Sequence, residues 1–397
     1  MIGSREIDAS ALGLWPVVGP EEISAATQVL ASGKLNYWTG DEGRSFETEF
    51  ADSINSKYAV ALANGTVAID AALIGIRFKA GDEAIVTPRS FVASASCVVN
   101  AGGRPVFVDV DRRSGNLDPE AVEAAITPRT RAIIAVHLAG WPCDMDALSS
   151  IAADRGISLI EDCAQAHGAR YRDRAVGSIG RVGTWSFCQD KIMTTAGEGG
   201  MLTTDDEEVW RRAWEYKDHG KSYDATIRRD HPSGYRWVHQ GIGTNWRLTE
   251  IQSAIGRVAL RNLDAWVLRR RSNAAILDKR LVENHALRIE IPATHEHHSY
   301  YKYYFYVREE SLRTGWSRCR IMDSVAARGV PCFSGSCSEI YREHGFASRG
   351  FEPKMRLPVA KELGETSLML LVHPTLDASQ MHLIADVVND VVAESTR

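Results

Sequence analysis

The chain contains 397 residues, 44% of them hydrophobic and 24% charged, with a formal net charge of −5. This length and composition allow a large buried core, in two domains or in one large domain with a lobe. The charge balance argues against a nucleic-acid-binding surface, and the apolar runs are too short to span a membrane. The first ten residues lack the apolar core of a signal peptide, so we expect a cytoplasmic protein. Its seven scattered cysteines are then reduced thiols rather than disulfides or zinc ligands.

The segment from about residue 58 to residue 205 alternates short apolar runs with stretches of helical periodicity. The apolar runs are continuous, as expected of strands that are buried on both faces of a parallel sheet. Helical connections between such strands produce a wound α/β sheet. We predict strands at 58–63, 83–88, 105–111, 131–140 and 157–163, and helices at 66–76, 91–102, 118–126 and 143–156.

The pattern changes after about residue 245. A long helical pattern with few breakers covers residues 248–284 and could connect two lobes. Strands and helices are mixed beyond it; we predict strands at 299–309 and 367–374, and helices at 317–329 and 377–392. The sequence therefore predicts a large α/β domain with a wound, mostly parallel sheet over residues 1–260, and a smaller α+β domain over residues 261–397.

Polar residues follow several of the predicted strands, and ligands of a wound sheet gather at the carboxyl ends of its strands. Asn64, Gly65 and Thr66 follow the first strand and open a helix. A glycine lets a phosphate approach the backbone, and the helix start offers free N–H groups. These three residues could form a phosphate cradle, although an ordinary N-cap turn would explain them as well.

Asp162 lies at the end of the predicted strand 157–163. A carboxylate buried at this place is unfavourable unless a positive group meets it, which suggests a ligand. Gln165 and His167 follow on the same short segment and could point to the same site or bond the local backbone. An acid in a surface turn or a helix cap is the alternative for Asp162.

The stretch "WSFCQDKIMTTAGEGGMLTT" (185–204) places a lone lysine, Lys191, after a short apolar strand and before a group of glycines. A lysine whose ammonium form is disfavoured by burial can lose its proton and attack a carbonyl group to form an imine. Ser186 ends the strand and could donate to a phosphate. A surface lysine and an ordinary strand serine are the alternatives.

A phosphate cradle, a carboxylate and a lysine at the ends of separate strands are together the groups that bind pyridoxal phosphate. The lysine forms a Schiff base, the carboxylate keeps the pyridine nitrogen protonated, and the cradle holds the phosphate. Phe91, which follows the next strand, could stack on the ring, although core packing would also explain it. The sequence thus predicts pyridoxal phosphate as the cofactor and no metal site.

The order of these segments resembles the DegT/StrS family of pyridoxal-phosphate-dependent sugar aminotransferases, which have the aminotransferase fold type I. The resemblance covers most of the chain. Besides the stretch around Lys191, it rests on "GPEEISAATQVLASGKLNYWTGDEGRSFETEFA" (19–51), "NGTVAIDAAL" (64–73), "VTPRSFVASA" (86–95), "PVFVDVD" (105–111), "EDCAQAHGA" (161–169), "GTNWRLTEIQSAIG" (243–256) and "LPVAKELGETSLMLLVHPTL" (357–376).

The resemblance implies a role for each polar candidate near the cofactor ring. Lys191 would form the covalent link to the cofactor and shuttle protons. Asp162 would pair with the pyridinium nitrogen, and Gln165 would bond the ring hydroxyl. His167 matches a histidine that is frequent in the family, and we include it among the catalytic candidates.

The resemblance also implies how the phosphate and the ring faces are held. Gly65, Thr66 and Ser186 would hold the phosphate, and Phe91 would stack on the ring. Asn245 would reach the phosphate of the cofactor in the neighbouring subunit. We therefore expect an obligate homodimer with shared active sites.

The activity that the resemblance implies is transfer of an amino group from glutamate or glutamine to a keto sugar, most often one linked to a nucleotide diphosphate. A carbocyclic ketone is an alternative acceptor. A sugar dehydratase of the same family would carry histidine in place of Lys191, and a non-catalytic regulator would lack the lysine or the aspartate. The acceptor pocket is expected to involve residues 36–40, 217–242 and 297–307.

Overall fold

The computed structural model describes residues 7–8, 12–228, 230 and 233–396. Its centre is a seven-stranded sheet with the strand order β1-β9-β8-β5-β4-β2-β3. Strands β3, β2, β4, β5 and β8 run parallel to one another, whereas β9 is antiparallel to both β8 and β1. The strands are β1 (Tyr58–Leu62), β2 (Glu83–Val86), β3 (Arg104–Phe107), β4 (Thr130–Val136), β5 (Ser158–Asp162), β8 (Val182–Ser186) and β9 (Gly200–Thr204). The predicted wound, mostly parallel sheet is confirmed.

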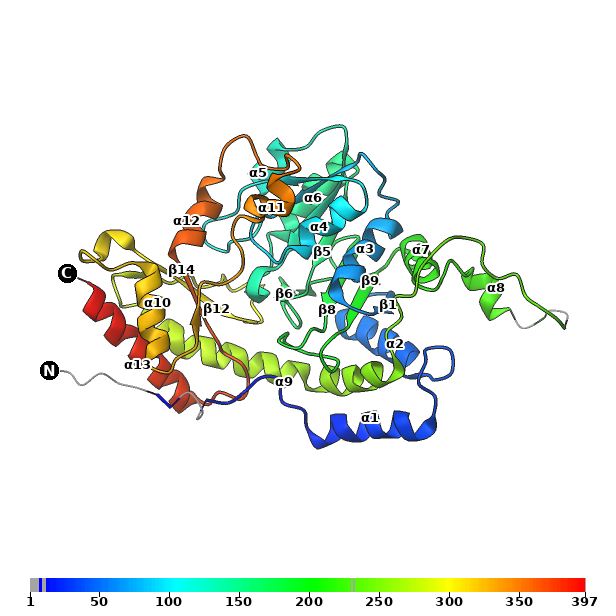
Figure 1. Ribbon diagram of the computed structural model, residues 1–397, viewed down its shortest axis with the longest axis horizontal. Helices are drawn as coiled ribbons and strands as arrows, with labels where there is room; N and C mark the ends of the chain where they lie inside the picture. The colour runs from blue at the N-terminus through cyan, green and yellow to red at the C-terminus, as the bar shows by residue number, and fades with distance from the viewer. Residues whose placement is uncertain (1–6, 9–11, 229, 231–232, 397) are drawn as a thin grey trace.

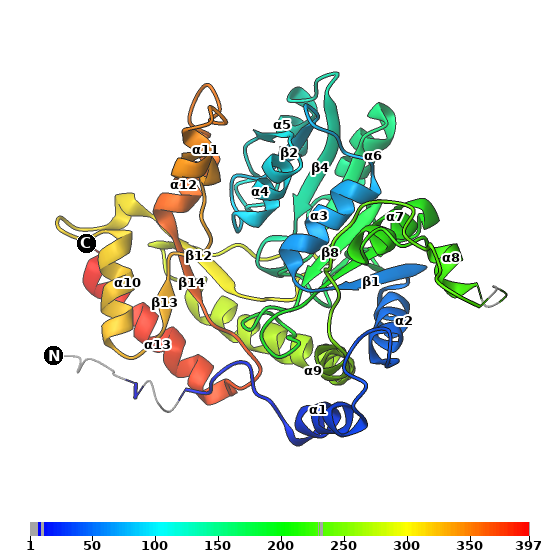
Figure 2. The same ribbon diagram turned by 45° about the vertical axis from the view of Figure 1, so that its right-hand side comes forward.

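Helices cover both faces of this sheet (Figures 1 and 2). On β4, Ala132 and Ile134 pack toward one face while Ile133 and Ala135 pack toward the other. This two-sided burial explains why the strands read as continuous apolar runs. One face is covered by α3 (Gly65–Gly75), α4 (Ala93–Asn100) and α7 (Glu207–Lys217), and the other by α5 (Pro119–Ala124) and α6 (Met145–Arg155).

The long helix α9 (Glu250–Leu281) runs from the large sheet to the C-terminal lobe (Figure 1). It begins at a capping box in which Thr249 and Gln252 satisfy each other's backbone N–H groups. Near its start it packs, with α2 (Glu42–Ile54), against the sheet, and its last turns pack into the core of the lobe. The predicted domain boundary after residue 260 falls inside this helix and stays a prediction.

The C-terminal lobe is built on a four-stranded antiparallel sheet with the order β10-β12-β14-β13. Its core joins this sheet to α9, α10 and α13. The lobe has an α+β composition, as predicted. Its main elements are β10 (Leu287–Arg288), β12 (Tyr303–Val307), α10 (Arg318–Ala327), β13 (Cys332–Phe333), α12 (Pro358–Thr366), β14 (Ser367–Leu370) and α13 (Ala378–Ser395).

Two further segments bear on the site. Helix α1 (Pro20–Ser32) lies along α9, and the chain before it passes beside the C-terminal lobe (Figure 1). After α7 the chain enters an arm that contains α8 (Tyr223–Ile227) and extends away from the body (Figure 1). Within the described ranges, no helix combines the length and apolar character needed to cross a bilayer.

Candidate active site

The carboxyl ends of β1, β5 and β8 meet at one edge of the large sheet, and three of the predicted residues lie there. Asp162 and Ser186 are the last residues of β5 and β8, and Gly65 opens α3 just after β1. A Cβ atom on Gly65 would lie only 2.5 Å from the Ser186 Cβ. The absence of a side chain at Gly65 therefore lets the start of α3 rest against the end of β8.

The start of α3 is an ordinary N-cap turn, which is the alternative explanation given above for Asn64, Gly65 and Thr66. The side chain of Asn64 accepts a hydrogen bond from the backbone N–H of Val67 at 3.0 Å. Gly65 and Thr66 stand in the first turn, and the N–H groups of the first turn of a helix have no intrahelical acceptor. The N-cap and the predicted phosphate cradle are therefore compatible. Asn64 satisfies the amide of Val67, and the amides of Gly65 and Thr66 stay available to an anion.

Asp162 is buried but is not neutralised by a cation. Its carboxylate accepts hydrogen bonds from the Ser94 hydroxyl at 2.7 Å and from the Ala164 N–H at 3.1 Å. Among the described residues, no lysine, arginine or histidine forms an ion pair with it. Because burying an unpaired carboxylate is unfavourable, this geometry fits a ligand that brings a positively charged group, such as a protonated ring nitrogen.

Lys191 lies in the loop between β8 and β9 with its backbone held and its amine free. The indole N–H of Trp15 donates to the Lys191 carbonyl oxygen at 2.8 Å. The Nζ atom lies 4.9 Å from the centre of the Tyr301 ring and makes no hydrogen bond or ion pair in the described part of the chain. A half-buried amine without an acidic partner is available to react with a carbonyl group.

Gln165 and His167 are both buried close to this edge of the sheet. The Gln165 side-chain oxygen accepts a hydrogen bond from the Ala139 N–H at 2.8 Å, which fixes the amide orientation. The His167 ring packs against the rings of Trp185 and Phe187, and neither of its nitrogens has a partner within the described ranges. Burial, assisted by the charges of Lys191 and Arg270, lowers the pKa of His167 to about 3. The imidazole is therefore neutral at pH 7, and its predicted catalytic role stays a prediction.

Phe91 and Asn245 lie at the solvent-exposed border of this region. The Phe91 side chain is 65% exposed, in the connection between β2 and α4. Asn245 is exposed too, and its side-chain oxygen accepts only a long bond from the Arg247 N–H at 3.4 Å. The Trp246 carbonyl accepts a hydrogen bond from the Ala63 N–H, so this segment lies beside the end of β1. The roles predicted for both residues stay predictions.

Three contacts of the site were not predicted from the sequence. Ser94 orients Asp162, Trp15 holds the Lys191 backbone, and Tyr301 pairs its hydroxyl with Asp190, the residue before Lys191. Ser94 stands in the quoted segment 86–95, where its position three residues after Phe91 could have indicated a polar contact. No sequence pattern indicated the contact of Trp15, because Trp15 is far from Lys191 in the sequence and stands outside every predicted element.

A buried cluster at the carboxyl ends of β4 and β5 could have been mistaken for a metal centre. His137, Glu161 and Cys163 place their ligand atoms within 4.8 Å of one another. The His137 Nε2 donates to Glu161 at 2.9 Å, while its Nδ1 accepts a bond from the Cys143 N–H. The Glu161 carboxylate also accepts bonds from the N–H groups of Gly177, Ile179 and Gly180. These bonds occupy the histidine and the carboxylate, so the cluster is a structural network.

The groups at the sheet edge fit pyridoxal phosphate. A free amine, a carboxylate without a cation and a helix start with open amides match the aldehyde, the ring nitrogen and the phosphate of that cofactor. Lys191 would hold the cofactor covalently, Asp162 would face the ring nitrogen, and Gly65, Thr66 and Ser186 would bind the phosphate.

Comparisons with known proteins agree with this chemistry. The DegT/DnrJ/EryC1/StrS aminotransferase family matches residues 16–389 of the chain. The structure is similar to that of the aminotransferase from Psychrobacter cryohalolentis, with 50% sequence identity, a TM-score of 0.95 and coverage of 97% of this chain and 99% of that one. It is also similar to S. venezuelae DesV in complex with a ketimine intermediate, with 32% identity, a TM-score of 0.84 and 95% coverage of both chains.

A third similar protein is the spore coat polysaccharide biosynthesis protein SpsC of Bacillus subtilis (strain 168). It is 38% identical over 255 residues, which cover 64% of this chain and 65% of SpsC. The chain belongs to the DegT/DnrJ/EryC1/StrS aminotransferase family and is a pyridoxal-phosphate-dependent aminotransferase of fold type I.

Proposed function

We propose that the enzyme transfers an amino group from glutamate or glutamine to the keto carbon of a nucleotide-linked keto-deoxysugar, in amino-sugar biosynthesis. The observation that carries this proposal is the free amine of Lys191 at the sheet edge that also holds Asp162. A lysine at this place favours transamination. The sugar dehydratases of the family carry a histidine at the same position. The polysaccharide-related name of SpsC supports a sugar acceptor.

In this proposal the chain's own groups divide the work. Bound pyridoxal phosphate supplies an electron sink for the carbon that loses or gains a proton. Lys191 would hold the cofactor and would serve as the acid and base that moves a proton at the substrate carbon. Asp162, oriented by Ser94, keeps the ring nitrogen protonated. The bond from Trp15 to the Lys191 carbonyl would hold the backbone in place on either side of this amine.

We also propose that the active enzyme is a homodimer in which Asn245 reaches the cofactor phosphate of the other subunit. Asn245 is exposed, and among the described residues its side chain has only the long contact with the Arg247 N–H, which supports this role. The arm after α7 carries large apolar side chains that are exposed to solvent in the single chain. Tyr235, Trp237 and Ile242 are 75%, 86% and 94% exposed. Apolar surface of this kind is typical of a protein interface.

Absorption spectroscopy of the purified protein tests the activity. Wild type saturated with pyridoxal phosphate should show the violet absorption band of lysine-bound cofactor, and glutamate should bleach it; Lys191→Ala should show neither change. A protein that forms no such band would refute the cofactor chemistry of the proposal. A panel of keto sugars and carbocyclic ketones, followed by mass spectrometry, then identifies the acceptor. A product that has lost water instead of gaining nitrogen would favour the dehydratase alternative.

A further inference from the structure

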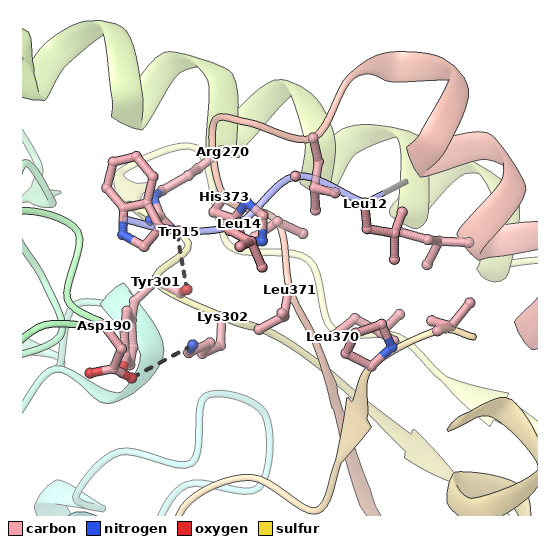
Figure 3. Close-up of a pocket in the computed structure, with 16 residues that line it drawn as sticks. Leu12, Leu14, Trp15, Asp190, Arg270, Tyr301, Lys302, Leu370, Leu371 and His373 are labelled. Atoms are coloured by element: carbon pink, nitrogen blue, oxygen red, sulfur yellow. Dashed lines mark hydrogen bonds and ion pairs between the residues drawn. The ribbon is translucent and has the colours of Figure 1, made fainter. Parts of the chain in front are cut away.

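A cavity of about 180 Å³ lies beside the predicted site, between the N-terminal segment, α9 and the end of β14 (Figure 3). Its apolar walls include Leu12, Leu14, Leu370 and Leu371. Its polar walls are Asp190, Arg270, Tyr301, Lys302 and His373. Asp190 directly precedes Lys191, and the Tyr301 ring is the one that lies 4.9 Å from the Lys191 Nζ. The cavity therefore adjoins the reactive lysine.

Arg270 is a buried cation of this cavity with unpaired hydrogen-bond donors. It is 1% exposed, and its Nη1 donates to the Tyr301 carbonyl oxygen at 3.1 Å (Figure 3). The guanidinium also lies over the Trp15 ring, 5.0 Å from its centre. Its Nε and Nη2 have no hydrogen-bond partner, and no carboxylate of the described residues forms an ion pair with it. Leaving a buried cation with open donors is unfavourable, so a ligand that satisfies them is expected to bind.

The charges of the other polar walls leave the cavity positive. Lys302 pairs with Asp190 at 3.7 Å, and Asp190 also accepts a bond from the Tyr301 hydroxyl (Figure 3). Burial, together with the charges of Arg270 and Lys302, lowers the pKa of His373 to about 4, so its ring is neutral at pH 7. Burial lowers the pKa of Arg270 to about 9, which leaves it protonated. Two cations thus face one carboxylate.

The chemistry of the cavity selects a carboxylate among the possible anions. The two open N–H groups of Arg270 belong to a planar fork that matches the two oxygens of a carboxylate. The leucine walls suit the methylene groups of an aliphatic acid, whereas a hydrated inorganic anion would gain nothing from them. Trp15 closes the cavity on one side and at the same time bonds the Lys191 carbonyl, so the cavity and the lysine share a wall.

We propose that this cavity binds the side-chain carboxylate of the amino donor, with Arg270 and Lys302 as the binding residues. The inference rests on the proposed transamination and makes it more specific. A cationic cavity beside Lys191 distinguishes glutamate from glutamine, because the amide of glutamine carries no charge to pair with Arg270. Arg270 and Lys302 are then specificity-determining residues for the donor half of the reaction.

Binding of glutarate to the holoenzyme tests the inference without relying on turnover. Glutarate has the two carboxylates of glutamate and no amino group, so it occupies the cavity without reacting. Quenching of tryptophan fluorescence reports binding, since Trp15 contacts Arg270. We expect Arg270→Gln to weaken glutarate binding roughly 10- to 100-fold, the loss typical of one charge-assisted pair. Lys302→Met, an independent variant should Arg270→Gln not fold, should weaken it less.

The matched control is Arg269→Gln, since Arg269 is the exposed neighbour of Arg270 on the same helix. This control should bind glutarate as wild type does. In the donor half-reaction, Arg270→Gln should raise the KM for glutamate and leave that for glutamine unchanged. Equal glutarate affinity in Arg270→Gln and wild type, or displacement of glutarate by equimolar chloride, would overturn the inference. A holoenzyme that binds glutarate but never reacts with glutamate would instead contradict the proposed function.

Discussion

Two carboxylates on neighbouring residues of β5 show opposite ways of burying a charge. Glu161 is fully enclosed, and its oxygens accept bonds from His137 and from three backbone N–H groups of residues 177–180. Asp162 points to the other face of the sheet and accepts only the Ser94 hydroxyl and one N–H. The first arrangement is complete without a ligand, whereas the second leaves a negative charge for something else to meet. Incomplete satisfaction of a buried polar group therefore marks the functional side of the strand.

The same contrast separates two buried or half-buried lysines. Lys217 is fully buried, pairs with Glu47 at 3.2 Å and lies 4.1 Å from the centre of the Tyr37 ring. Lys191 lies near a ring as well but forms no ion pair with an acid among the described residues. Burial lowers the pKa of Lys217, and the Glu47 carboxylate opposes that effect and occupies the amine. Of these two lysines, Lys191 is the one whose amine has no carboxylate partner among the described residues, as its predicted role requires.

The sharpest test of this contrast is Asp162→Asn. The amide keeps the shape, but its single oxygen can accept only one of the two bonds from Ser94 and Ala164. Being uncharged, it also cannot hold a proton on the ring nitrogen of the cofactor. We expect the rate of the glutamate half-reaction to fall by at least about 100-fold, as for loss of one strong electrostatic contact. Stopped-flow spectroscopy measures this rate. A variant that reacts at the wild-type rate would show that Asp162 does not face the ring nitrogen.

Glu161→Ala is the reciprocal experiment. It leaves His137 and the N–H groups of Gly177, Ile179 and Gly180 buried without their acceptor. We expect the free energy of unfolding to fall by about 3–5 kcal/mol, because several buried donors lose their acceptor at once and each costs about 1–3 kcal/mol. Urea unfolding followed by circular dichroism measures the loss. Glu161→Gln, which keeps one acceptor oxygen, should lose less, and equal losses in the two variants would contradict the account of the network.

A pH titration of stability tests whether burial keeps His167 neutral in the folded enzyme. Burial holds the folded-state pKa of His167 at about 3, well below the 6.5 of an unfolded histidine. Between these values the unfolded chain binds more protons, so stability falls as the pH falls from 6.5 toward 3. Between pH 6.5 and pH 5, wild type should lose about 2 kcal/mol more stability than His167→Phe.

Urea unfolding at pH 6.5 and pH 5, with the same cofactor saturation for both proteins, measures this difference. Parallel losses in wild type and His167→Phe would mean that His167 is protonated in the folded enzyme. In that case the histidine could donate a proton, which would be one form of its predicted catalytic role.

The sequence was a good guide wherever structure depends on local pattern. Continuous apolar runs predicted the buried strands, and the positions of Gly65, Asp162 and Ser186 after them predicted three residues at one edge of the sheet. The contacts of Trp15, Arg270 and Tyr301 could not be predicted, because they depend on how the N-terminal segment and the C-terminal lobe pack around the loop of Lys191. Arg270 in particular stands in the basic run 269–271, which reads as a solvated helix face until the fold buries it.

The variant with the smallest expected effect tests whether Asn64 serves as a helix cap or as part of the phosphate cradle at the start of α3. Asn64→Ala removes the acceptor for the Val67 N–H, which should lower the free energy of unfolding by about 1 kcal/mol. Because the Gly65 and Thr66 amides remain, the affinity for pyridoxal phosphate should change by less than about threefold, as judged by fluorescence titration of the apoenzyme. Gly65→Ala should do the opposite, since its Cβ would press on Ser186 and displace the amides from the phosphate. A large loss of cofactor affinity in Asn64→Ala alone would show that the cap side chain itself holds the phosphate.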